Sequence, residues 1–165
     1  MLAITLPVQA ALATEPSPTP QTVNSFEVFW PMVAGKTVTD PLYKLKLFKE
    51  NVRGALIFGN LQRADYLIFL AVKRSLEIEK LLQESNLPAA QKTVILEQLT
   101  LTKAGVSYDH YKSAGDTDTS GLGPQMVIRL DSMTKLFTWL GAKNSQNKEL
   151  LQPLVDQVQA LKVRL

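Results

Sequence analysis

The most constraining feature of the sequence is the run from Asn60 to Ser85, which is apolar around most of a helical circumference. Its main stripe has helical spacing and consists of Leu61, Ala64, Ile68, Ala71, Val72, Ser75, Ile78 and Leu82. A further apolar edge is formed by Tyr66, Phe69 and Leu70. A helix with this pattern is usually covered on more than one side. We therefore predict that this run is the long central helix of a bundle, about 39 Å in length at ~1.5 Å per residue.

A basic amphipathic helix is predicted just before it, over residues 41–58. Thr39 or Asp40 can cap its start, Pro41 suits the first helical position, and Gly59 with the asparagine after it suits its end. Its apolar stripe consists of Leu42, Leu45, Val52 and Leu56, with Phe48 beside them. The cations around this stripe are Lys44, Lys46, Lys49 and Arg53. We expect the stripe to be buried in the bundle.

Three further helices are predicted after the Leu87-Pro88 turn, over residues 89–113, over 125–142 and after a polar turn at 144–147. Pro153 is expected to delay the start of the last one. Its apolar positions are Leu151, Leu154, Val155, Val158, Leu161 and Leu165. No strand pattern is present, so the expected fold is all-α, a bundle of about five helices. A chain of 165 residues is enough for one domain with a real core.

The N-terminal part is predicted to lie outside that domain, which we place at residues 40–165. Residues 1–13 are apolar and uncharged and end in Ala11-Leu12-Ala13, which matches a secretory leader with a small-residue cleavage site but no basic start. A frayed apolar terminus is the alternative. We expect export, cleavage near Ala13 and an extracytoplasmic location. No run reaches the ~18 apolar residues of a membrane span.

Residues 14–39 are predicted to be an extended linker. Its first part, TEPSPTPQ, alternates proline with small polar residues and favours a solvated spacer. Its second part carries an aromatic clip with Phe29 and Trp30, which we expect to dock on the bundle. The alternative is a ligand platform.

The composition argues against several classes of function. A net charge of +3 with mixed signs lacks the dense basic stripe of a nucleic-acid-binding protein. The absence of cysteine excludes disulfides and thiolate metal sites. There is no phosphate loop, nucleophile elbow or zinc motif, and the single histidine, His110, has the pattern of a surface residue. Glu77 and Glu79 lie on different helix faces and are expected to pair with charges one turn away. We predict no catalytic residue and no cofactor.

One loop resembles half of a calcium site. Asp116, Asp118 and Ser120 supply oxygen at positions 1, 3 and 5, followed by glycine at position 6. The bidentate glutamate expected at position 12 is replaced by Val127. We therefore expect calcium to bind weakly, if it binds at all. The same residue types are also common in any exposed turn.

A resemblance to a family of predicted exported bacterial proteins without assigned activity covers about residues 29–85. It rests on the segment Asp40-Pro-Leu-Tyr-Lys-Leu-Lys46 with Lys49-Glu and Arg53, and on Ala71-Val-Lys-Arg74 with Glu77. These are similar to a "D-x-P-L-Y-x-L-K" helix start and an "A-x-x-R-L-x-E" second helix. The resemblance implies an extracytoplasmic helical domain and no catalytic residues.

These observations leave three hypotheses. The first is a non-enzymatic scaffold or interaction module at the bacterial cell envelope, with an unknown protein or envelope partner. The second is binding to a membrane surface through Lys44, Lys46, Lys49 and Arg53 on helix 41–58, with lysine stems beside the apolar stripe. Burial of that stripe would argue against it, and its exposure would favour it. The third is an enzyme or small-ligand binder whose site the sequence does not reveal.

Overall fold

The computed structural model describes residues 23–29 and 32–165. In these residues it has six helices and no strand. The helices are α1 (Ser25–Phe29), α2 (Tyr43–Ala55), α3 (Asn60–Gln83), α4 (Leu87–Ser113), α5 (Leu122–Ala142) and α6 (Ser145–Arg164). The all-α prediction is thus confirmed, with α1 in addition to the five helices expected. The predicted leader and spacer, and Trp30 of the aromatic clip, lie outside the described residues.

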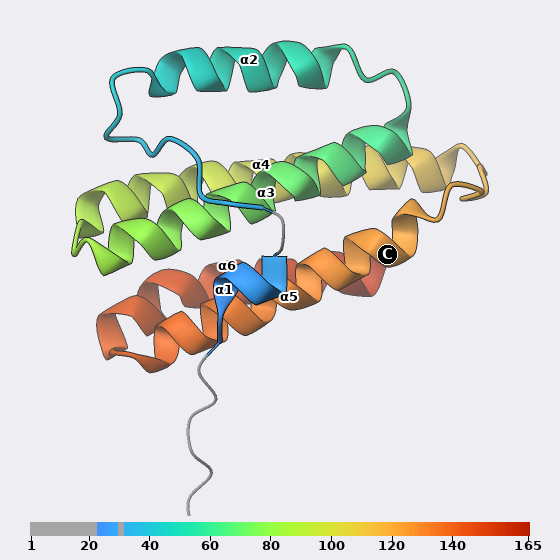
Figure 1. Ribbon diagram of the computed structural model, residues 1–165. Helices are drawn as coiled ribbons and strands as arrows, with labels where there is room; N and C mark the ends of the chain where they lie inside the picture. Colours follow the sequence, from blue (N-terminus) through green and yellow to red (C-terminus); the bar gives the residue numbers. More distant parts are fainter. Residues whose placement is uncertain (1–22, 30–31) are drawn as a thin grey trace, which may run out of the picture.

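Four helices surround one core. α3 packs on α4 and on α5, and α6 packs on α4 and on α5. The elements form layers, with α3 and α4 between α2 on one side and the α5–α6 pair on the other (Figure 1). α2 makes only a small contact with α3. α3 is therefore the central helix that its apolar pattern predicted.

Side chains from all four helices fill the core. Among the fully buried ones are Ile68, Ile78, Leu101, Met126, Leu130, Met133, Phe137, Leu140, Leu151 and Leu154. Phe29 of α1 is also buried in this core, so the predicted docking of the clip is confirmed at that residue.

Capping side chains define several helix starts. Asn86 accepts a hydrogen bond from the Ala89 N–H, and α4 begins at Leu87, two residues before the predicted start. Asn144 likewise accepts from the Asn147 N–H, so α6 begins at Ser145. The expectation that Pro153 delays this helix was wrong. Pro153 lies in the interior of α6, because the cap at Asn144 already determines the start.

The boundaries of α2 also differ from the prediction. The Asp40 carboxylate accepts from the Leu42 N–H at 2.8 Å, which orders a turn, and the regular helix begins only at Tyr43. The helix ends at Ala55, before the predicted stop. Gly59 is extended, with φ of −84° and ψ of 136°, and directly precedes α3.

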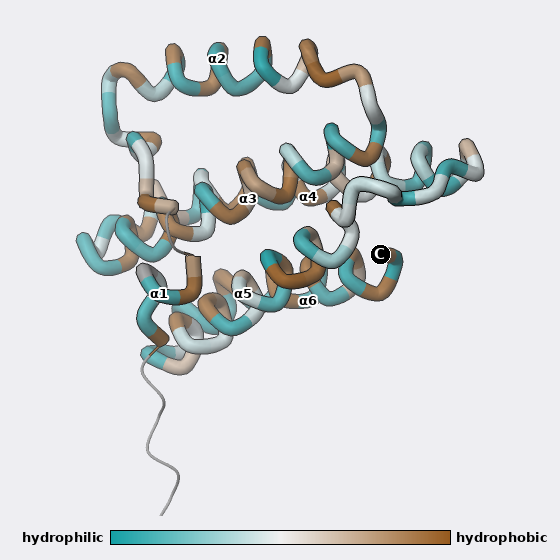
Figure 2. Tube along the Cα trace, turned by 45° about the vertical axis from the view of Figure 1, so that its right-hand side comes forward, coloured by the Kyte–Doolittle hydropathy of each residue, from teal (hydrophilic) through white to brown (hydrophobic). Residues whose placement is uncertain are grey.

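The expectation that the apolar stripe of α2 is buried was wrong. Hydropathy alternates along α2 as on an amphipathic helix (Figure 2), yet Tyr43 is its only buried residue. Leu45, Phe48, Val52 and Leu56 are exposed by 62%, 64%, 44% and 66%. The face that carries Tyr43 is the one that meets the bundle, because polar groups of α3 pair with it.

Candidate functional site: helix α2 and the polar cluster beneath it

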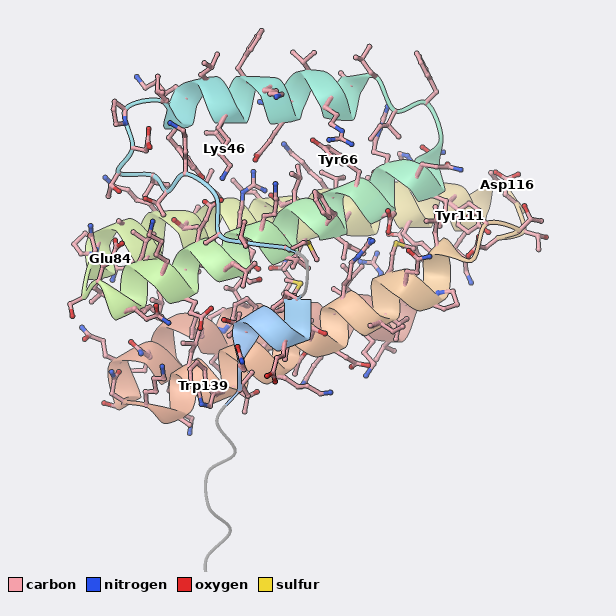
Figure 3. All side chains as sticks on the ribbon, viewed as in Figure 1. Lys46, Tyr66, Glu84, Tyr111, Asp116 and Trp139 are labelled. Atoms are coloured by element: carbon pink, nitrogen blue, oxygen red, sulfur yellow. The ribbon has the colours of Figure 1, made fainter. Side chains whose placement is uncertain are left out.

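The inward face of α2 is polar. Tyr43, Lys46 and Glu50 are spaced by three and four residues, so they share one side of the helix. Lys46 lies on the side of α2 that faces α3, and Tyr66 lies between the two helices (Figure 3). Tyr43 is 6% exposed. A polar surface of α2 therefore covers α3.

Lys46 joins three parts of the chain. Its ammonium group forms an ion pair with Glu77 of α3, and Glu77 has no exposed surface. It also donates to the Lys36 carbonyl at 3.0 Å and lies 3.8 Å from the Glu50 carboxylate. The expectation that Glu77 pairs with a charge one turn away was wrong, since its partner lies on another helix. Burial raises the pKa of Glu77, although Lys46 acts against that increase.

Arg74 connects α2 to α4 through α3. Its guanidinium donates to Glu50 of α2 at 3.1 Å and to the Thr100 hydroxyl of α4. It is nearly buried. Because Arg74 is charged and removed from water, these partners are needed to offset its desolvation.

Glu97 of α4, like Glu77, has no exposed surface. Its Oε1 lies 2.7 Å from the Ser75 hydroxyl, which donates to it, and the same hydroxyl oxygen lies 3.1 Å from the Ala71 carbonyl oxygen. Burial raises the pKa of Glu97 to about 8, against smaller opposing effects of Ser75 and Arg74. The carboxyl is therefore protonated at neutral pH. Burial likewise raises the pKa of Tyr43 to about 12.

We call these residues the polar cluster: Tyr43, Lys46, Glu50, Arg74, Ser75, Glu77, Glu97 and Thr100. Within the described residues, three of its oxygens have no hydrogen-bond partner: the Tyr43 hydroxyl, Glu77 Oε2 and Glu97 Oε2. The charges of Lys46 and Arg74 balance those of Glu50 and Glu77. Its ion pairs attach α2 to the bundle electrostatically.

The four cations predicted to form one basic surface are divided by this arrangement. Lys46 turns inward to Glu77, whereas Lys44, Lys49 and Arg53 are exposed. The three exposed cations flank the outward apolar stripe, which we define as Leu42, Leu45, Phe48, Val52 and Leu56, continued by Phe58 in the loop after α2. Every exposed charged residue of α2 is basic, because Glu50, its one acid, lies in the cluster.

In the candidate calcium loop, Asp118 has a structural role. Its Oδ1 accepts from the N–H and hydroxyl of Ser120 and from the Gly121 N–H, and its Oδ2 accepts from the Gly123 N–H at 2.8 Å. These bonds, the Ser120 hydroxyl first, lower the pKa of Asp118 to about 2. They order the first turn of α5, which explains why that helix begins at Leu122 and not at residue 125. Among the described residues, no group of three or more His, Cys, Asp or Glu side chains could hold a metal ion. The weak calcium binding expected at Asp116, Asp118 and Ser120 stays a prediction.

Sequence reasoning missed the polar cluster, although a signal was present. Arg74 and Glu77 interrupt the apolar pattern of the central helix α3. Glu97 lies three and four residues from Val94 and Leu101 on a buried face. Charged residues at such positions are rarely buried without partners.

Comparisons of the chain with protein-family models, with curated proteins and with solved structures found no match. Among the residues that the structure describes, none of the helices combines the length and apolarity that crossing a membrane requires.

Proposed function

We propose that this chain is a peripheral membrane-surface protein that attaches to anionic lipid bilayers through α2. The observation that carries the proposal is the exposure of the apolar stripe. Leaving a side chain of this size in water costs about 1.5–3 kcal/mol relative to burying it. Several such residues in one row, ending at Phe58 with 91% exposure, form a surface that is expected to be covered when the protein works.

The charges around the stripe favour a bilayer as the occupant. A helix that lies in a membrane interface places apolar side chains among the acyl chains and keeps cations at the headgroups. Lys44 flanks one edge of the stripe, and Lys49 and Arg53 flank the other. Each such cation contributes about 1 kcal/mol near an anionic surface. The inward ion pairs of Lys46 and Arg74 support this orientation of α2 without using the stripe.

This is the second of the three starting hypotheses. It is compatible with the first, because an anionic bilayer would be the envelope partner of the helical domain. Its extracytoplasmic location still rests on residues 1–13 and stays a prediction. Mass spectrometry of the chain in its host tests it, since a mature N-terminus near Thr14 is expected, and an intact chain in the cytoplasm would contradict it.

Vesicle co-sedimentation tests the membrane proposal. We expect wild type to bind vesicles that contain phosphatidylglycerol, more weakly as salt rises, and to bind pure phosphatidylcholine poorly. Leu45→Ser combined with Phe48→Ser removes about 3 kcal/mol of apolar transfer energy, so binding should fall by about tenfold or more. The matched control is Ile128→Ser combined with Val163→Ser, two exposed apolar residues on α5 and α6, which should bind like wild type.

Two results would overturn the proposal. One is equal vesicle binding by the stripe variant and its control. The other has two parts: wild type is a dimer in analytical ultracentrifugation and binds no vesicles, and the stripe variant is a monomer. A second copy of the chain would then cover the stripe.

A further inference from the structure

A cleft of about 320 Å³ lies along one flank of α2, between this helix and α3. Its charged lining consists of Lys36, Lys46, Lys49, Arg53, Lys73 and the single acid Glu50. Its walls include the rings of Tyr66 and Phe69. The volume falls at the lower end of the range of small-ligand pockets, ~300–1,000 Å³. Five cations against one carboxylate make this cleft strongly basic in a chain whose net charge is only +3.

Among the described residues, two of these cations have a carboxylate partner. Lys46 pairs with Glu77 and Glu50, and Lys36 lies 3.4 Å from Asp40. Within the part of the chain that the structure describes, no carboxylate pairs with the other three cations, Lys49, Arg53 and Lys73. Like charges that line one cleft repel each other, and a bound anion would relieve that repulsion.

The aromatic walls position two of the unpaired cations. The Arg53 guanidinium lies 5.4 Å from the centroid of the Tyr66 ring, and the Lys73 ammonium lies 5.3 Å from that of Phe69. Such cation–π contacts hold a charge in place without neutralising it. Tyr66 is also held in place, since its hydroxyl donates to the Glu50 carbonyl at 3.2 Å. The two cations are therefore held at the wall of the cleft, and their charge is not neutralised by a carboxylate of the described residues.

We propose that this cleft binds the phosphate group of a small ligand, either a lipid headgroup or a free phosphate ester. Arg53 supplies the planar fork that binds phosphate oxygens in pairs, and Lys49 and Lys73 supply point charges. The inference deepens the proposed membrane function, because Lys49 adjoins both Phe48 of the apolar stripe and the cleft. A headgroup phosphate in the cleft would thus lie beside acyl chains that contact the stripe.

Two binding measurements test the inference and separate the two phosphate sources. The first is isothermal titration calorimetry with glycerol 3-phosphate, which has the headgroup chemistry without a lipid chain. The second is sedimentation with phosphatidylglycerol vesicles. The cleft variant is Arg53→Gln combined with Lys73→Gln. The charge control is Lys92→Gln combined with Lys103→Gln, two exposed lysines of α4 that neither line the cleft nor flank the stripe.

We expect wild type and the charge control to bind glycerol 3-phosphate equally, and the cleft variant to bind it about tenfold more weakly or worse, since two charge-assisted contacts are lost. Far-UV circular dichroism checks that the variant is folded, and Arg53→Lys provides a milder second variant that should retain part of the affinity. Equal affinities of cleft variant and charge control, or no saturable binding by folded wild type, would overturn the inference.

The outcomes also separate this inference from the proposed function. Vesicle binding that depends on the stripe but not on the cleft, together with no glycerol 3-phosphate binding, would leave the membrane proposal standing and overturn the phosphate site. Binding of glycerol 3-phosphate that is lost in the cleft variant, without vesicle binding, would support the site for a free phosphate ester and contradict the membrane proposal.

Discussion

Glu97 shows how a single residue can carry a pH dependence. Its carboxyl has no exposed surface, and only Ser75 donates to it. Of the charges around it, Arg74 favours the ionised form and Glu77 opposes it, but burial has the largest effect. The folded protein therefore keeps a proton on Glu97 up to a pH of about 8, whereas the unfolded chain releases it near 4.5.

The sign of the resulting pH dependence follows from linkage. Between those two pH values the folded state binds more protons than the unfolded state, so the free energy of unfolding should fall as pH rises from about 4.5 to about 8. Glu97→Gln removes this ionisation and keeps an oxygen that can accept from Ser75. We expect the variant to be more stable than wild type at pH 9, by about 2 kcal/mol or more, and nearly equal to it at pH 5.

Urea unfolding at pH 5, 7 and 9 measures this difference. Part of the slope should persist in the variant, because the pKa of Glu77 is raised as well. Asp118 does not affect the pH dependence of stability between pH 5 and pH 9. Because its pKa is lowered to about 2, its contribution to the free energy of unfolding is lost only as the pH falls below about 4 toward 2. Identical slopes for the variant and wild type would show that Glu97 is not buried in solution.

At the scale of the element, α2 and α3 are both amphipathic but differ in what covers them. The apolar surface of α3 is enclosed, with Ile68 and Ala71 fully buried. The apolar stripe of α2 faces away from the bundle. The same chemical change should therefore have opposite consequences on the two helices.

Ile68→Asp should unfold the domain or destabilise it by several kcal/mol, because an unpaired carboxylate would be buried. Total stability is typically only ~5–15 kcal/mol. Leu45→Asp makes the same kind of substitution at an exposed position and should change stability by less than about 0.5 kcal/mol. Glu84→Ala should be equally silent, since its side chain is exposed and its partner Lys80 is 3.9 Å away.

Thermal melts by circular dichroism compare the three variants. An Ile68→Asp melt within a degree or two of wild type would show that α3 is not central. A large loss of stability in Leu45→Asp would show that the stripe of α2 is buried after all, and the membrane proposal would lose its carrying observation.

At the scale of the whole molecule, α3 to α6 form a complete four-helix bundle onto which α1 and α2 are added. Among the described side chains, Phe29 of α1 and Tyr43 of α2 are the buried residues that these two helices contribute. Apart from Phe29, the buried residues of the main core cluster all lie on α3 to α6.

Residues 59–165 should consequently fold alone, with a cooperative melt at a lower temperature than the full chain. Removing α2 also lets water reach the polar cluster, so the raised pKa of Glu97 should move toward its ordinary value and the pH dependence of stability should weaken. Near-UV circular dichroism and melts at pH 5 and 9 measure both effects. A shortened chain without fixed tertiary packing would show that α1 and α2 are part of the core fold.

The sequence by itself determined the five longer helical segments and that α3 is central, but it did not reveal the short helix α1. Helical period, capping residues and the continuous apolar surface of residues 60–85 are local properties, and local physics is enough to infer them. The same pattern showed that α2 has an apolar and a basic side. It also contained Arg74, Glu77 and Glu97 as charges on apolar faces, without indicating their partners.

Only the tertiary structure decided which side of α2 faces the bundle. Period defines two opposite faces but does not state which one meets a neighbour. The decision rests on pairs that are distant in the sequence, such as Lys46 with Glu77 and Arg74 with Glu50, separated by 31 and 24 residues. A buried carboxylate such as Glu77 requires a cation nearby. In the folded chain this cation is Lys46, which lies on the polar side of α2. Because of these pairs, the apolar stripe of α2 faces outward, and Lys49, Arg53 and Lys73 come together at one cleft. The sequence of either helix alone does not indicate this arrangement.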